Sequence, residues 1–186
     1  MIIIKNDKEI DLMRIAGRIV AETLLLVEKK VKPGITTAEL DRIAEEFITK
    51  HGAIPSFKGL YGFPASLCIS VNEQVVHGIP GGYVLKEGDI ISVDCGAHIN
   101  GFHGDAARTF AVGNISEEAN KLIKVTEESF FKGLEFAKVG NKLTDISHEI
   151  QRYVEASGFS VVRDFVGHGI GKSVHEDPEV PNFGRP

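Results

Sequence analysis

The sequence predicts an α+β fold in which helices pack outside an antiparallel sheet. Long segments repeat their apolar side chains every three or four residues, and short apolar runs stand between turn signals. A third observation is Asn100-Gly101, because Asn-Gly between two such runs favours a tight β-hairpin. We expect residues 1–186 to form a single domain, since 186 residues with 42% hydrophobic content can bury a substantial core.

The first part of the chain predicts two amphipathic helices. Asn6-Asp7-Lys8-Glu9 offers a capping box, after which apolar residues recur at steps of three and four. Thr36-Thr37-Ala38-Glu39 gives a second cap signal, and we expect the helix that follows it to end near Gly52.

Strands follow, and then more helices. Residues 66–71 and 90–95 read as strands, and a third strand is expected around 106–112, after the Asn-Gly turn. The helical period returns over 122–136 and again over 146–158.

The chain also contains a weak internal repeat. Gly34 and Leu40 align with Gly140 and Ile146, and the pattern Val-His-x-x-Pro occurs at 76–80 and at 174–178. We interpret this as two related halves, about 1–113 and 114–186, with a site between them.

Composition excludes several classes of protein. The net charge of -5 gives no basic stripe for direct nucleic-acid binding, and no segment is apolar enough to predict a membrane span or a signal peptide. Two cysteines are too few for a disulfide framework, although one bridge stays open. We therefore expect a soluble, cytoplasmic protein. We also expect a monomer.

Asp94 and Asp105 are the sharpest candidates for chemistry. If Asn100-Gly101 forms the turn, Asp94 lies opposite Ala107 and diagonally from Asp105, so both carboxylates share a face. Two close carboxylates need a compensating positive charge. Arg108 and a divalent cation are equally good candidates for that charge.

Histidines supply the other candidates. His168 lies among glycines, which would leave room for a metal or a substrate, but it could equally be a buried structural histidine. His77 and His175 precede turns that end in proline, which suggests functional loops or simply surface turns. His103 would share the face of the two aspartates.

Taken together, five ordered motifs resemble type I methionine aminopeptidases of peptidase family M24. The motifs are Cys68-Ile69-Ser70-Val71-Asn72-Glu73 through His77-Gly78-Ile79-Pro80, Gly88-Asp89-Ile90-Ile91-Ser92-Val93-Asp94, Gly104-Asp105, Gly167-His168-Gly169-Ile170-Gly171 and His175-Glu176. The resemblance implies the pita-bread fold, with two pseudo-symmetric halves around two divalent metals, and the removal of initiator methionine from nascent proteins and peptides.

By position, the resemblance implies that Asp94, Asp105 and His168 bind the metals, with Asp105 bridging them. It implies that His77 and His175 contact the substrate and steady its tetrahedral intermediate. Oxygen ligands with one imidazole suit Co, Mn, Fe(II) or Zn.

The resemblance also implies a pocket for the methionine side chain, and plain core packing is the alternative for its residues. The candidates for this pocket are Phe57, Phe63, Cys68 and Val174. At Leu60-Tyr61 the resemblance implies an aromatic residue at the first of the two positions, where this sequence has leucine.

The resemblance also implies two further glutamate ligands on the family's last strands, and this sequence ends at Pro186 before those strands. Neither Glu176 nor Glu179 matches the position of a glutamate ligand. From this we expect incomplete metal binding and lower stability. The alternatives are a non-catalytic binding protein with the same fold and a prolidase-like metallopeptidase. The expected partner is a peptide or a nascent chain at the ribosome.

Overall fold

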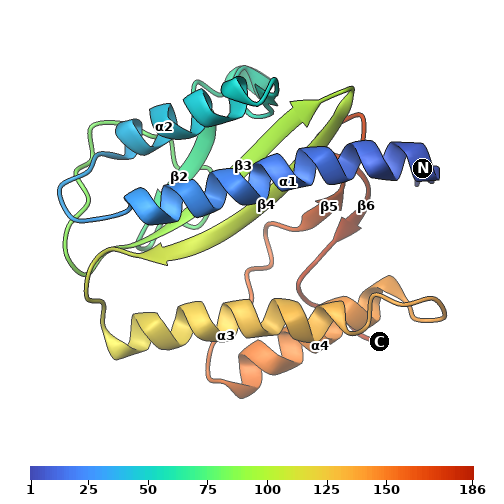
Figure 1. Cartoon of the computed structure of the whole chain (residues 1–186). Helices are drawn as coiled ribbons and strands as arrows, with labels where there is room; N and C mark the ends of the chain where they lie inside the picture. The colour runs from blue at the N-terminus through green and yellow to red at the C-terminus, as the bar shows by residue number, and fades with distance from the viewer. The chain divides into compact units, whose positions relative to one another are not determined.

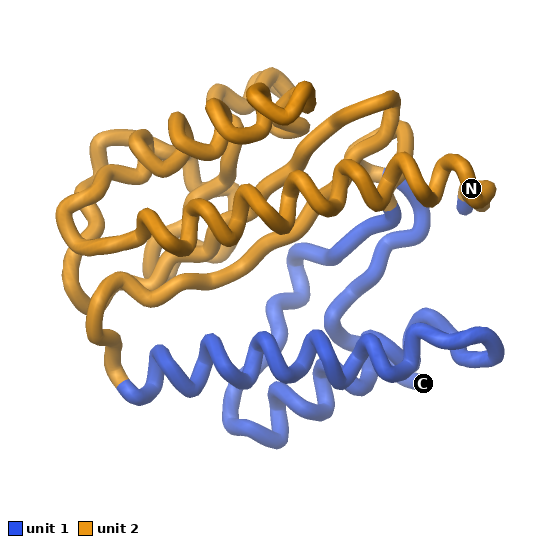
Figure 2. The backbone as a smooth tube through the Cα atoms, in the orientation of Figure 1, with its two compact units in different colours: residues 1–2, 117–169, 176–186 blue, residues 3–116, 170–175 orange.

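The computed structural model describes residues 1–186, and the chain divides into two compact units (Figure 2). Unit 2, drawn in orange, comprises residues 3–116 and 170–175. Unit 1, drawn in blue, comprises residues 1–2, 117–169 and 176–186.

Unit 2 begins with the two expected helices, α1 (Asp7–Lys30) and α2 (Thr37–Lys50). The capping box is confirmed: Glu9 N donates to Asn6 Oδ1 at 3.1 Å, and Asn6 N donates to Glu9 Oε2 at 3.0 Å. At α2 the Thr36 hydroxyl accepts a hydrogen bond from Glu39 N at 3.1 Å. These bonds satisfy N–H groups that the first turn of a helix leaves unpaired.

A four-stranded antiparallel sheet completes unit 2. The long hairpin of β3 (Ile90–Ile99) and β4 (Phe102–Ala111) forms its centre, and both β1 (Ile54–Pro55) and β2 (Leu67–Val71) pair with β3. Asn100 and Gly101 have φ of 54° and 82°, the positive values that the predicted tight turn requires. The hairpin strands run farther toward this turn than we expected, because ladder pairing continues to Ile99 and Phe102.

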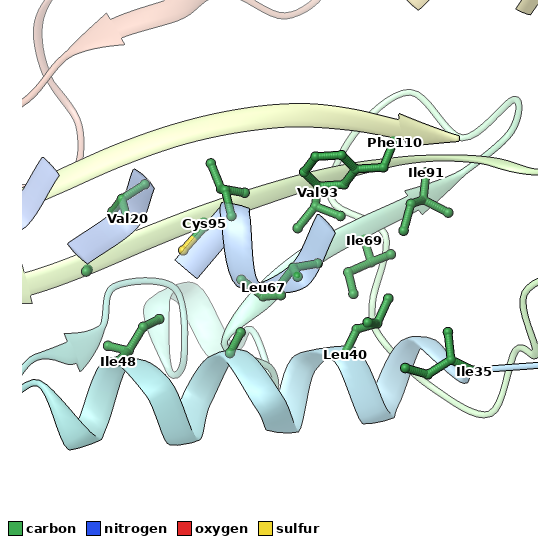
Figure 3. Packing of buried hydrophobic residues seen from close by; sticks show 14 of the residues in the cluster. Val20, Ile35, Leu40, Ile48, Leu67, Ile69, Ile91, Val93, Cys95 and Phe110 are labelled. Atoms are coloured by element: carbon green, nitrogen blue, oxygen red, sulfur yellow. The ribbon is translucent and has the colours of Figure 1, made fainter. Parts of the chain in front are cut away.

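α1 and α2 cover one face of this sheet (Figures 1 and 3). Leu40 and Ile48 of α2 and Val20 of α1 are buried there against Ile69 and Val93 (Figure 3). The opposite face carries the two aspartates, and we call it the carboxylate face. The helix layer thus supplies the main core on one face of the sheet and leaves the other face to the two aspartates and their neighbours.

Unit 1 contains α3 (Glu117–Leu134) packed against α4 (Leu143–Ala156), and the two-stranded sheet of β5 (Gly167–Gly169) and β6 (Glu176–Val180). The first of these helices was expected to reach residue 136 but ends two residues earlier, where a turn closes with Phe136 N donating to Gly133 O. None of the helices has the length and apolar character needed to cross a membrane. The relation between the two sequence halves stays a prediction.

Candidate metal and substrate site

The β3–β4 ladder places Asp94 and Asp105 as the sequence predicted. Asp94 lies opposite Ala107, and Asp105 lies opposite Gly96, so the two aspartates are diagonal neighbours on the carboxylate face. Both residues are partly buried, and their side chains share a hydrogen bond. Two carboxyl groups can share such a bond only when one of them carries a proton.

Burial and repulsion together change the acidity of this pair. Burial is the largest cause that raises the pKa of Asp94, and the charge and hydrogen bond of Asp105 add to it, so the pKa rises to about 8. A hydrogen bond with the backbone of Cys95 acts in the opposite direction. The pair therefore holds a proton near neutral pH, where a divalent cation would compensate the same charges.

Arg108 does not compensate these carboxylates. It lies opposite Val93, on the face covered by α1, and pairs with Glu28 at 3.6 Å. Our alternative of an Asp–Arg ion pair is therefore wrong. The cause is strand alternation, which turns Arg108 to the face opposite Asp105.

The expected pocket residues gather beside Asp94. Cys68 pairs with Asp94 across β2 and β3, and it forms an apolar cluster with Phe57 and Val174, against which Leu60 and Phe63 pack. Burial, followed by the charge of Asp94, raises the pKa of the Cys68 thiol to about 12. We call these five residues the apolar cluster.

The two cysteines are both free. Cys95 faces the helix-covered core, whereas Cys68 faces the apolar cluster. Strand alternation therefore directs the two thiols to opposite sides of the sheet, and the single bridge left open by the sequence does not form.

His77 and His175 both belong to unit 2 and are both exposed. His77 lies in the loop after β2 with φ of 60°, a left-handed conformation that is rare for residues other than glycine. The ring of His175 stacks on Tyr61 with centroids 6.3 Å apart. The backbone of Tyr61 is also in the left-handed conformation, with φ of 49°.

His168 lies in unit 1, opposite Glu179 in the β5–β6 pair. Its Nδ1 is 2.8 Å from the carbonyl oxygen of Gly169. Because a carbonyl only accepts, Nδ1 is the donor in this bond. A histidine that binds a metal commonly has this arrangement.

Packing between two strands explains why a glycine follows His168, and we did not anticipate this explanation. A Cβ on Gly169 would lie 2.3 Å from Asp177 O, so only glycine fits the close approach of β5 to β6. Strand packing therefore accounts for Gly169, and the expectation that the glycines around His168 leave room for a ligand stays a prediction.

His103 lies on the carboxylate face, as expected, and has partners that the sequence did not reveal. Its Nδ1 is 2.8 Å from Ser56 Oγ, and its ring lies 4.4 Å from that of His98. The strand register could have predicted the His98 contact. No local signal could have predicted Ser56, which is brought to this face by the short β1 pairing.

Within residues 1–186, no three His, Cys, Asp or Glu side chains are gathered closely enough to hold a metal ion. A surface cavity of about 440 Å³ lies between the end of α1 and the start of α2, lined partly by Lys29, Lys32 and Arg42. It contains none of the candidate residues.

Residues 11–186 match metallopeptidase family M24. The chain is 78% identical over 186 residues to "Methionine aminopeptidase" of Clostridium perfringens and 61% identical to "Methionine aminopeptidase 1" of Bacillus subtilis. It covers 75% of the length of each relative.

Among solved structures, the methionine aminopeptidase of Thermotoga maritima superposes on the whole chain with a TM-score of 0.98 at 46% identity, and 75% of that chain is covered. The prolidase of Pyrococcus furiosus superposes with a TM-score of 0.87, at 22% identity and 53% coverage of that chain, which shows a common fold alone. These likenesses confirm the expected pita-bread fold, and the chain belongs to metallopeptidase family M24, with the methionine aminopeptidases.

Proposed function

We propose that this chain carries out the metal-dependent removal of methionine from the N-terminus of peptides and nascent proteins. The observation that carries the proposal is the partly buried Asp94–Asp105 pair, whose side chains share a hydrogen bond. The family match and the relative of 78% identity, which bears the name methionine aminopeptidase, support the same activity.

The chemistry of the donor atoms suits a divalent metal, and the structure brings two of the three side chains, Asp94 and Asp105, together. Asp94 and Asp105 would supply oxygen ligands, and His168 would supply a nitrogen ligand through Nε2, because its Nδ1 donates to Gly169 O. Oxygen and imidazole donors suit Co, Mn, Fe(II) or Zn. When bound, such ions polarise a peptide carbonyl and lower the pKa of water.

The chain's own residues would bind and orient the substrate. The apolar cluster beside Asp94 would receive the unbranched methionine side chain. His77 and His175, both exposed, would donate hydrogen bonds to the substrate carbonyl oxygen as negative charge develops on it. One such donor contributes roughly 3–4 kcal/mol in well-organised sites.

Release of methionine from Met-Ala-Ser in the presence of Mn, Co or Fe(II) tests this proposal. We expect Asp105→Ala and His168→Ala to abolish metal-dependent release, whereas Asp11→Ala should leave it unchanged. Asp11 is the matched control, because its carboxylate is exposed and pairs only with Arg14 at 2.7 Å in the first helix.

The same assay separates the other two hypotheses. Release that survives Asp105→Ala and His168→Ala would contradict the assigned ligands. Cleavage of X-Pro peptides alone would favour a prolidase-like enzyme. Metal and peptide binding without hydrolysis, measured by calorimetry, would favour a binding protein.

We also propose that the chain works in the cytoplasm as a monomer that meets nascent polypeptides at the ribosome. Two free cysteines fit a reducing compartment. Sedimentation with ribosomes that carry a methionine-initiated nascent chain tests the association, and light scattering tests the monomer.

A further inference from the structure

The loop that carries His77 is held against β2 by one buried side chain, Ser70. Ser70 is 3% exposed and lies on the carboxylate face, two residues after Cys68. Its Oγ accepts a hydrogen bond from the backbone N–H of Gly78 at 3.1 Å. Gly78 follows His77 directly, so this bond fixes the peptide group that joins the two residues.

The backbone at Gly78 makes a second bond with the same strand. Ile69 N donates to Gly78 O at 2.8 Å, so both polar groups of Gly78 are bound to adjacent residues of β2. A Cβ at Gly78 would lie 2.1 Å from Ile69 O, which shows how closely the loop approaches the strand. Only glycine fits this contact.

His77 needs such a restraint because its conformation is unfavourable. Its φ of 60° is left-handed, a backbone conformation that is unfavourable for residues other than glycine. The ring is exposed, so burial does not fix its direction. A strained residue of this kind persists only where its surroundings determine the backbone.

The base of the loop is closed separately. The buried Asp89 carboxylate accepts hydrogen bonds from Asn72 Nδ2 at 2.9 Å, from Tyr83 Oη at 3.1 Å and from Lys86 N at 2.9 Å. The loop ends are therefore fixed without Ser70. What Ser70 adds is a restraint beside His77 itself.

We propose that Ser70 is a positioning residue: its hydroxyl, acting through the Gly78 amide, sets the direction of the His77 imidazole. This inference rests on the proposed role of His77 in the aminopeptidase reaction. Its structural part, that Ser70 controls His77, can be tested without that role.

Ser92 provides a matched control. It is the register partner of Ser70 on β3 and lies on the same face, but its hydroxyl pairs with Thr109 Oγ1 at 2.9 Å. Ser70→Ala and Ser92→Ala each remove one hydroxyl from the same row, and only the first removes the bond to the loop. Ser70→Thr keeps the hydroxyl.

The first measurement is the NMR signal of the His77 Cε1–H group, with hydrogen exchange of the Gly78 amide. In Ser70→Ala we expect a shifted or broadened His77 signal and faster Gly78 exchange, in Ser92→Ala neither change, and in Ser70→Thr a return toward the original. Equal spectra for the two alanine variants would overturn the inference.

The second measurement is a double-mutant cycle on Met-Ala-Ser with His77→Ala. Loss of one neutral hydrogen bond predicts that Ser70→Ala lowers kcat about threefold to tenfold with unchanged KM. In the His77→Ala background we expect no further loss, because Ser70 acts through His77. Additive losses would contradict positioning. If His77→Ala leaves activity unchanged, the proposed role of His77 fails, while the NMR result still decides the structural part.

Discussion

Asp94 and Asp105 lie diagonally across the β3–β4 hairpin and share a hydrogen bond in a partly buried site. The folded pKa of Asp94, about 8, lies above its ordinary value of 3.8, so the folded metal-free chain binds more protons than the unfolded chain between these values. The free energy of unfolding should therefore be highest below pH 3.8, as far as Asp94 is concerned, and should fall as pH rises toward 8.

Urea unfolding in EDTA at pH 5 and pH 8 tests this dependence. Asp105→Asn removes the neighbouring charge, so we expect a smaller loss of stability toward pH 8 than in the unmodified chain. Addition of Mn at pH 8 should stabilise the unmodified chain in proportion to ln(1 + [Mn]/Kd) and should stabilise the variant less. An identical pH slope in both proteins would mean that repulsion between the carboxylates is not the cause.

Local sequence signals predicted much of unit 2. The capping box at Asn6, the Thr36 cap and the Asn100-Gly101 turn each depend on a few consecutive residues, and each forms as expected. The turn fixes the register, so the diagonal placement of Asp94 and Asp105 followed from the sequence as well. Side-chain alternation from that register would also have turned Arg108 away from them.

Contacts between distant segments were not predictable in the same way. The bond from His103 to Ser56 depends on β1 pairing, and the apolar cluster joins Phe57 to Val174 across most of the chain. No periodicity in the sequence encodes such contacts. The cluster residues were named from a family resemblance, and the structure brings them together, but their role toward a substrate stays a proposal.

Asp41 should stabilise the start of β2. Its Oδ1 accepts hydrogen bonds from the backbone N–H groups of Ser66 at 2.9 Å and Leu67 at 2.7 Å, and both residues are fully buried. Asp41→Ala leaves two buried donors unpaired, so the free energy of unfolding should fall by about 2–4 kcal/mol. Asp41→Asn, which keeps an acceptor oxygen, should cost less. Urea unfolding at pH 7 measures both, and equal losses would contradict this explanation.

Alanine substitutions at Gly104 and Gly17, which meet at one contact between α1 and β4, should change the stability of the chain in opposite directions. A Cβ on Gly104 would lie 2.7 Å from Ala16 C and from Gly17 N, so Gly104→Ala should push the helix from the sheet and destabilise the chain by about 1–3 kcal/mol. A Cβ on Gly17 meets nothing within 4 Å, so Gly17→Ala should stabilise the helix by about 0.5–1 kcal/mol. Thermal unfolding of both variants measures the difference. Stabilisation by Gly104→Ala would show that the helix is not held this closely.

Phe63 distinguishes a substrate pocket from plain core packing. It packs at the edge of the apolar cluster and is only partly buried, so its loss should disturb the fold less than loss of the buried Phe57. If the cluster receives the methionine side chain, Phe63→Ala removes about 1–2 kcal/mol of apolar contact, which predicts an increase in KM for Met-Ala-Ser of about fivefold to thirtyfold. Phe130→Ala, an exposed aromatic residue on α3, is the control and should leave KM unchanged. Steady-state kinetics beside thermal unfolding decides between the two explanations: a lower melting temperature with unchanged KM would assign Phe63 to the core, because a residue that contacts the substrate cannot be removed without changing its binding.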